Sequence, residues 1–83
     1  MSAAEAVKAV DLHGMNAYQA KIALDAVLRR ADGSVYRVRA IHGYNAGTAL
    51  KDFVRAEYAK HPKVIRIAPG PNPGATDLIL REW

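Results

Sequence analysis

The stretch Ile41-His42-Gly43-Tyr44-Asn45-Ala46-Gly47-Thr48-Ala49-Leu50 decides the fold of this chain. Its apolar start predicts the end of a buried strand, its two glycines predict a turn, and its last residues predict the start of a helix. A turn of this kind directs backbone N–H groups and the positive end of a helix dipole toward one point. His42 stands beside that point, so we expect a site for an anionic ligand here.

A second stretch of the same kind is Val10-Asp11-Leu12-His13-Gly14. It also predicts a strand that runs into a turn, with Asp11 and His13 at the carboxyl end of the strand. We expect the fold to bring these two turns side by side.

The apolar pattern of the whole chain predicts alternating strands and helices. Strands are expected at 6–12, 35–41, 64–68 and 76–81, and a loop at 69–74. Asn16 and Gln19 form a capping-box pattern before a helix that ends near Ala31. Gly47 or Thr48 caps a second helix, which ends before Pro62. The aromatic residues predicted for the core are Tyr18, Tyr36, Phe53 and Tyr58.

The order β-α-β-α-β-β predicts an α/β (α+β) two-layer sandwich, in which a mixed four-stranded sheet carries two helices on one face. Both β-α-β units should form parallel pairs with right-handed crossovers, and the last two strands should pair antiparallel. Arg37 and Arg39 alternate with Tyr36, Val38 and Ala40. This alternation predicts that the other sheet face is open to water or to a partner, since a sheet covered on both faces would be apolar throughout.

Asp11, His13 and His42 are the candidate catalytic residues. If the first two strands are parallel neighbours, about 4.8 Å apart, their carboxyl ends share one edge of the sheet. Open α/β sheets bind ligands beyond that edge. We therefore expect the three side chains to crowd one rim beside two helix N-termini.

Composition narrows the class of protein. The 83 residues correspond to one small domain, 1–83, and the absence of cysteine excludes disulfides and thiolate metal sites. We see no signal peptide and no apolar run long enough for a membrane span, which favours a cytoplasmic protein. The net charge of +4 favours a polyanionic partner, DNA or RNA, although solvated lysines and arginines would give the same balance.

The two turns also carry a family resemblance. Asp11-Leu12-His13-Gly14 resembles the Leu-Asp-Leu-His-Gly block of the small MutS-related, or Smr, domain, with Val10 in place of the first leucine. Ile41-His42-Gly43, followed by Gly47, Thr48 and Leu50, resembles the His-Gly-x-Gly block and helix start of that family. Asn45 stands where the family has its second glycine, and the turn is one residue longer before Gly47.

The resemblance implies a fold similar to the C-terminal domain of translation initiation factor three. It also implies nucleic-acid binding and, in some members, endonuclease activity by nicking of DNA or cleavage of RNA. The Asn45 side chain would intrude where bare backbone normally faces the ligand. A binding module without chemistry, or a domain that binds a protein or a small anion, therefore stays an alternative.

Each candidate residue has a functional and a purely structural interpretation. His42 either acts as a general base or acid, or holds a phosphate as the imidazolium, or makes local hydrogen bonds that brace its turn. Asp11 either orients a histidine, or binds Mg²⁺ or Mn²⁺, or fixes its own turn; no cofactor is certain. The candidate phosphate- or nucleic-acid-binding residues, each with an ordinary structural alternative, are Gly14, Gly43, Tyr44, Asn45, Gly47, Thr48, Lys51, Arg37 and Arg39.

Overall fold

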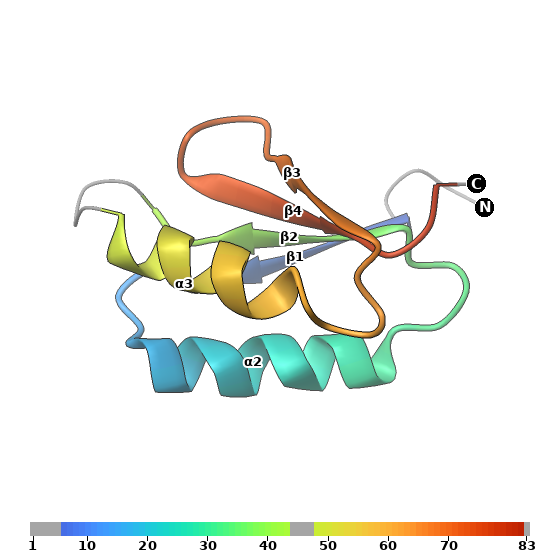
Figure 1. The fold of residues 1–83 in the computed structure, drawn as a ribbon, viewed down its shortest axis with the longest axis horizontal. Coiled ribbons are helices and arrows are strands. Elements are labelled where there is room, and N and C mark those ends of the chain that lie inside the picture. Colours follow the sequence, from blue (N-terminus) through green and yellow to red (C-terminus); the bar gives the residue numbers. More distant parts are fainter. Residues whose placement is uncertain (1–5, 44–47, 83) are drawn as a thin grey trace.

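A computed structural model describes residues 6–43 and 48–82 of the chain. The predicted element order is confirmed (Figure 1). The elements are β1 (Val7–Asp11), α2 (Ala17–Arg30), β2 (Arg37–Ile41), α3 (Ala49–Tyr58), β3 (Arg66–Pro69) and β4 (Ala75–Ile79). Both helices lie on one side of the sheet, which leaves the other sheet face without a helical layer. None of the helices among these residues is long and apolar enough to cross a membrane.

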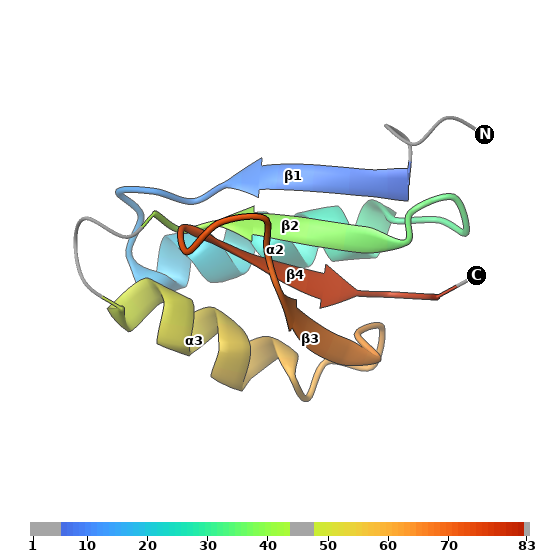
Figure 2. The same cartoon turned by 90° about the horizontal axis from the view of Figure 1, so that it is seen from above.

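The strands lie in the order β1-β2-β4-β3 (Figure 2). β1 and β2 are parallel, as predicted, and β3 pairs antiparallel with β4. The prediction of a parallel pair from the second β-α-β unit is wrong, because β4 lies between β2 and β3 and pairs antiparallel with β2. All five residues of β4 are buried, which suits an interior strand. β3 contains an exposed arginine and a proline, which an edge strand tolerates best.

The predicted strand limits differ from the observed ones by at most two residues. Val64 is buried in the core but precedes β3, whereas Pro69, predicted to lie in the loop, is the last residue of that strand. Proline is compatible with this place because β3 is an edge strand and needs fewer backbone donors.

Local signals account for the helix ends. The Asn16 side chain accepts a hydrogen bond from the Gln19 backbone N–H at 2.8 Å, and the Gln19 side chain accepts one from the Asn16 N–H at 3.0 Å, which confirms the capping box. Lys63 donates to the Leu28 carbonyl at 2.6 Å and so satisfies one of the last carbonyls of α2. Thr48 occupies the N-cap position of α3 but makes no side-chain bond to the backbone there.

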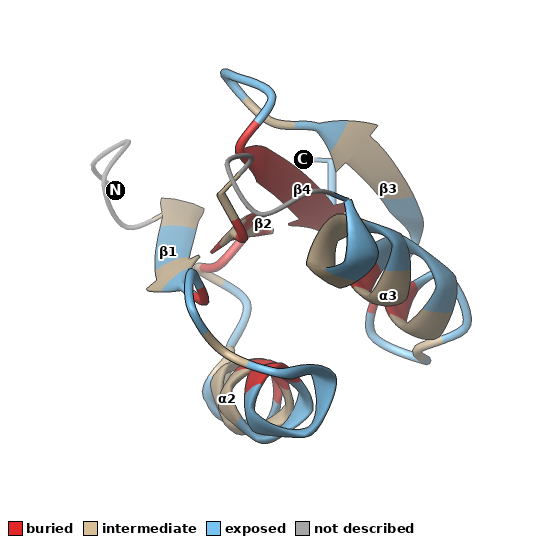
Figure 3. Cartoon of the chain, turned by 90° about the vertical axis from the view of Figure 1, so that its left-hand side faces the viewer, coloured by how far each residue is buried: buried red, intermediate tan, exposed pale blue. Residues whose placement is uncertain are grey.

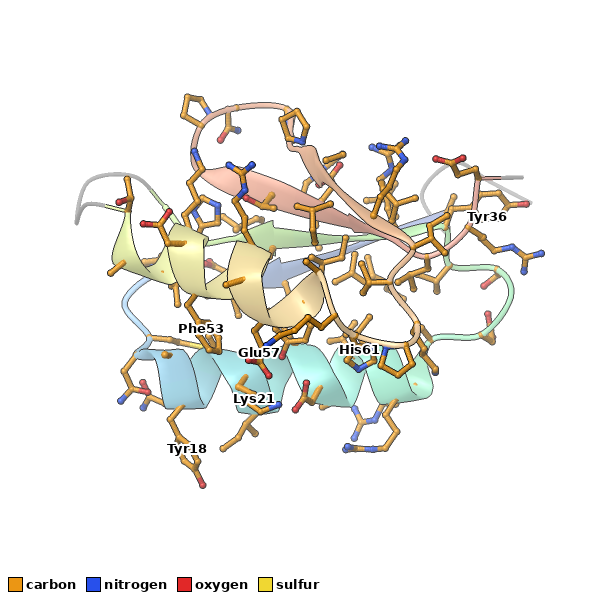
Figure 4. The ribbon with its side chains drawn as sticks, in the orientation of Figure 1. Tyr18, Lys21, Tyr36, Phe53, Glu57 and His61 are labelled. Carbon is orange, nitrogen blue, oxygen red and sulfur yellow. The ribbon has the colours of Figure 1, made fainter. Side chains whose placement is uncertain are left out.

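The core fills the space between the sheet and the helices. Its fully buried members are Leu12, Ala20, Leu24, Leu28, Val38, Ala40, Val54 and Leu78. Tyr58 belongs to it as predicted, and its hydroxyl donates to Asp25 at 2.7 Å, which links α3 to α2. Tyr18 does not: it is 74% exposed and points away from the sheet (Figure 4). Tyr18, the residue after Ala17, precedes the buried Ala20 by two positions. Its side chain therefore lies about 200° around the helix from that of Ala20, on the opposite side.

Two other aromatic residues have mixed environments. Phe53 is partly buried and packs against the core. Tyr36 is half-buried, and the Arg81 guanidinium lies 5.3 Å from its ring centroid. These two positions therefore agree only in part with the predicted core.

Candidate functional site

The two turns lie side by side, as the sequence predicts. Asp11 is paired with Ile41 in the parallel ladder, and the Leu12 N–H donates to the Ile41 carbonyl at 2.7 Å. A Cβ atom added to Gly43 would lie 3.7 Å from the His13 Cβ, so the second turn contacts the first directly. Figure 3 looks onto this end of the molecule, where β1 and β2 finish.

The glycine after each histidine has a left-handed backbone. Gly14 has a φ of 79° and Gly43 a φ of 76°, whereas no other residue type in the described part of the chain has a positive φ. Side chains with a Cβ atom are strained in this region, and glycine is not. The two His-Gly pairs therefore bend the chain sharply at the same rim.

Asp11 and His13 form an exposed carboxylate–imidazole pair. The His13 Nδ1 lies 2.5 Å from the Asp11 Oδ1, and the His13 backbone N–H donates to the same oxygen at 3.1 Å. Because an ionised carboxylate only accepts hydrogen bonds, Nδ1 must carry the proton, and Nε2 is the nitrogen that can accept one. The two side chains are 58% and 73% exposed, so Nε2 can reach a ligand in solvent.

The hydrogen bond between Asp11 and His13 shifts the pKa of each group. The side-chain hydrogen bond from His13 lowers the pKa of Asp11 below its ordinary value of 3.8. The same bond raises the pKa of His13 above 6.5. Between the lowered and the raised pKa both groups are charged, and the ion pair is lost by protonation of Asp11 below this window and by deprotonation of His13 above it.

We expect the ring signals of His13 in NMR spectra to titrate with a midpoint above 6.5, for this reason. In Asp11→Asn the carboxylate is gone, so the midpoint should fall toward the ordinary histidine value. His61, whose ring accepts from the Lys63 backbone N–H and which makes no contact with Asp11, is the internal control. A His13 midpoint that is identical in the two proteins would contradict the pairing.

His42 is buried and has both ring nitrogens engaged. It is 6% exposed. Its Nδ1 lies 2.8 Å from the Gly43 carbonyl, which can only accept, so Nδ1 donates. Its Nε2 lies 2.9 Å from the Thr76 hydroxyl, so a second hydrogen bond holds the ring. These contacts favour the structural interpretation of His42, in which the ring braces the turn.

A third chain segment, which the sequence analysis missed, holds this turn from the other side. The Gly74 carbonyl accepts from the His42 N–H at 2.9 Å and from the Gly43 N–H at 3.0 Å. The Asn72 side chain in turn accepts from the Gly74 N–H at 2.9 Å. The available signal was topological: β4 runs antiparallel to β2, so it begins at the edge where β2 ends.

The structure brings the three candidate catalytic residues to one rim but not to one pocket. Asp11 shares the open face of the sheet with its partner Ile41. His42 is the next residue after Ile41, so its side chain points to the helix-covered face, where it meets Thr76. The expected single cluster is therefore wrong, because side chains alternate between the two faces of a strand.

A cleft of about 320 Å³ opens on the helix side of the rim. Its walls come from the N-terminal ends of both helices and from the two turns; the lining residues are Gly14, Met15, Asn16, Ala17, His42, Ala49 and Leu50. Backbone N–H groups at helix N-termini favour a negatively charged group. Thr48 and Lys51 flank the same helix start. Tyr44, Asn45 and Gly47 lie outside the described residues.

The open face of the sheet carries a buried carboxylate between two arginines. Arg39 donates to Asp77 from Nε at 2.9 Å and from Nη2 at 3.0 Å, and Arg37 donates from Nη1 at 2.8 Å. Asp77 is 0% exposed, and Arg37 and Arg39 are 39% and 28% exposed. Burial alone would raise the pKa of Asp77, but the hydrogen bonds from Arg39 and Arg37 outweigh it and keep this pKa below 3.8.

Asp77 was missed because no residue near it in sequence marks it as special. The available signal was a carboxylate inside the predicted strand 76–81, directly before the apolar run Leu78-Ile79-Leu80. Two further arginines also have partners: Arg66 pairs with Glu82, and Arg81 donates to the Gly33 carbonyl at 2.7 Å.

The described residues offer little to a metal ion. No three His, Asp or Glu side chains among residues 6–43 and 48–82 are grouped closely enough to hold one. Asp11 supplies a carboxylate, but its Oδ1 already accepts two bonds from His13. By themselves these groups supply one carboxylate to Mg²⁺ or Mn²⁺, ions that take six ligands in octahedral geometry.

Comparison with known proteins agrees with this fold and these motifs. The crystal structure of the Smr domain of Thermus thermophilus MutS2 matches with a TM-score of 0.79 and 28% sequence identity, over 90% of this chain and 99% of that chain. No curated protein matches the chain. The family model of the Smr domain matches residues 10–77, which include both His-Gly turns and Asp77. The chain therefore belongs to the Smr domain family.

Proposed function

We propose that this Smr domain binds nucleic acid at the rim formed by its two His-Gly turns, and that the Asp11–His13 pair cleaves a phosphodiester bond there. The observation that carries the proposal is the pair itself. An imidazole held through Nδ1 by a carboxylate lies, with Nε2 exposed, beside two glycine turns that each lead into a helix.

The rim suits a phosphate group. Gly14 and Gly43 keep side chains away from the backbone at both turns, and the starts of α2 and α3 face the same cleft. Their helix dipoles favour an anion. We assign the phosphate to the mouth of this cleft at Gly14, the residue that follows His13, with Thr48 and Lys51 nearby at the start of α3.

The chemistry then needs only proton transfer. The neutral His13 accepts a proton at Nε2 from the attacking hydroxyl, either water or a ribose 2′-OH, as its oxygen bonds to phosphorus. The bond from phosphorus to the leaving oxygen breaks, and the imidazolium returns its proton to that oxygen. Asp11 holds the ring and stabilises the imidazolium while the charge is present. No step is assigned to a metal ion or to His42.

Arg37 and Arg39 are proposed as a second contact, on the open face. Two guanidiniums against one carboxylate leave one net positive charge on this patch, which is enough to attract a backbone phosphate but less than the sequence suggests. Nucleic acid bound by such a surface should dissociate as salt rises, since bound counterions are displaced on binding.

One specific observation favours a second candidate function, binding without cleavage. His42, a histidine of the family motif, is buried and has both ring nitrogens bonded within the chain, so it is not placed to take a proton from a substrate. In this version the rim holds the phosphate backbone, and the Asp11–His13 pair contributes charge alone.

The test compares the purified protein with Asp11→Asn and His13→Ala on supercoiled plasmid and on structured RNA, with and without Mg²⁺ or Mn²⁺. We expect cleavage to fall roughly 100-fold or more in both variants, the usual size of a general acid–base contribution. Both side chains are exposed, so circular dichroism should show an unchanged fold. His61→Ala is the matched control, because it removes a histidine far from the pair in sequence.

The outcomes separate the candidates. Cleavage that survives in both variants would refute the role of the pair. Salt-dependent retention of nucleic acid without any turnover would support the binding module. A protein that retains neither DNA nor RNA at low salt would contradict both and favour a protein or a small anion as partner.

A further inference from the structure

A second cleft, of about 450 Å³, lies between α3 and the β3–β4 hairpin. The hairpin and α3 are neighbours in both views of the fold (Figures 1 and 2). Lys51 and Arg55 line one side of the cleft, one helical turn apart. The other side is mostly apolar and is formed by Ile67, Ala68, Pro69, Gly70, Asn72, Pro73, Ala75 and Thr76.

The two cations of this cleft differ from the arginines on the sheet in having no carboxylate partner among the described residues. Arg37 and Arg39 pair with Asp77, and Arg66 pairs with Glu82. Within residues 6–43 and 48–82, neither Lys51 nor Arg55 has a carboxylate within ion-pair distance. Their charge is therefore available to a ligand, whereas most of the charge on the open face is neutralised internally.

The cleft adjoins the proposed phosphate site at the rim. Thr76 lines the second cleft, and its hydroxyl bonds to His42, which lines the first. Leu50 and Lys51, consecutive residues of α3, line the first and the second cleft respectively. Among the described residues, this hydrogen-bonded pair and the start of α3 lie between the two clefts, so one extended ligand can occupy both.

We propose that this cleft binds the nucleotide next to the phosphate held at the rim, and that the ligand is single-stranded there. The proposal rests on the proposed function, because it extends the same binding site. A nucleotide has a negatively charged phosphate and a flat, largely apolar base, which match the cationic and the apolar sides of the cleft. The volume lies within the range of small-molecule sites, roughly 300–1,000 Å³.

Single strands fit this arrangement better than duplexes do. The bases of a duplex are stacked on one another and paired, so none can lie against the apolar wall formed by β3 and the loop after it. Proteins that bind single strands combine a positive groove with surfaces on which unstacked bases rest. Lys51 and Arg55 would supply the positive part, and Ile67 and the prolines the surface.

The experiment measures fluorescence anisotropy of labelled single-stranded DNA and RNA oligonucleotides and of a duplex of the same sequence. The wild-type protein should bind single strands more tightly than the duplex. The double variant Lys51→Ala/Arg55→Ala should lose at least about tenfold in affinity, as expected for lost hydrogen bonds to charged groups. Its logarithmic salt slope should fall by about 1.4, since each phosphate contact contributes roughly 0.7 on single strands.

The matched control is Arg29→Ala/Lys60→Ala, which removes the same net charge from two exposed positions outside the cleft, one in the last turn of α2 and one in the turn after α3. In NMR spectra, adenosine monophosphate should shift the backbone signals of residues 67–75, whereas inorganic phosphate at the same concentration should not.

The results distinguish this inference from the proposed function. If the wild-type protein binds no nucleic acid, both fail together. If it binds and the cleft variant binds equally well, or loses no more than the control, the proposed function stands and the cleft is refuted. Equal affinity for duplex and single strand refutes the single-stranded ligand, and equal NMR shifts with inorganic phosphate refute the nucleotide.

Discussion

Replacing Asp77 with alanine should lower the free energy of unfolding by about 3 kcal/mol or more, the low end of the cost of breaking a buried ion pair. The carboxylate is fully buried and accepts three hydrogen bonds from Arg37 and Arg39. Without it, two guanidiniums are left close together with no counter-charge. Because both arginines are partly exposed, water should recover some of the loss. Urea unfolding followed by circular dichroism measures the change.

Asp77→Asn is the informative companion to this variant, because it keeps the shape and removes the charge. The pKa of Asp77 is lower in the folded protein than its ordinary value, so the carboxylate stabilises the fold at any pH above 3.8. That stabilisation is lost as the pH falls through the lower, folded pKa. Wild-type stability should therefore fall more steeply in acid than the stability of Asp77→Asn, and parallel curves would contradict the assignment.

Replacing His42 with alanine should cost about 2–3 kcal/mol of stability, from a cavity and from polar groups that lose their partners. The ring is buried, and its removal leaves the Thr76 hydroxyl and the Gly43 carbonyl without their bonds. The Gly43 turn should loosen with it. Thermal and urea unfolding measure the loss, and Thr76→Val is the matched control, since it breaks one of the two bonds and keeps the volume.

The expected loss of stability in His42→Ala affects how the nuclease hypothesis can be tested. Loss of activity in His42→Ala would be expected from damage to the turn alone, so it would not identify a proton carrier. Asp11 and His13 are exposed and can be changed without this effect. A His42→Ala protein as stable as wild type would contradict the bracing role and return His42 to the list of chemical candidates.

The sequence predicted what depends on neighbours along the chain. The capping box at Asn16 and Gln19 and the succession of elements follow from local patterns, and the structure confirms them. The bond between Asp11 and His13 also joins near neighbours, two residues apart, but the sequence indicated only that Asp11 could orient a histidine and did not identify His13 as that partner. The parallel pairing of β1 and β2 required one further inference from the crossover rule.

What could not be predicted depends on strand order and on which face a side chain takes. The place of β4 between β2 and β3 is not encoded in any local pattern, and it determines the partners of Asp77 and Thr76. The direction of the His42 side chain follows from the register of the strand end, which propensities locate only to within a few residues. For this reason the three residues expected to form one cluster are separated: Asp11 and His13 form an exposed pair, and His42 is buried and stabilises its turn.

The position of β4 also governs how the domain acquires its structure. β2 can complete its hydrogen bonding only with a strand about forty residues further along, and β3 has no other neighbour in the sheet. Such distant pairing delays cooperative assembly until the intervening chain has closed into a loop. During synthesis, therefore, the two His-Gly turns should have no fixed geometry until the last strand of the sheet has left the ribosome.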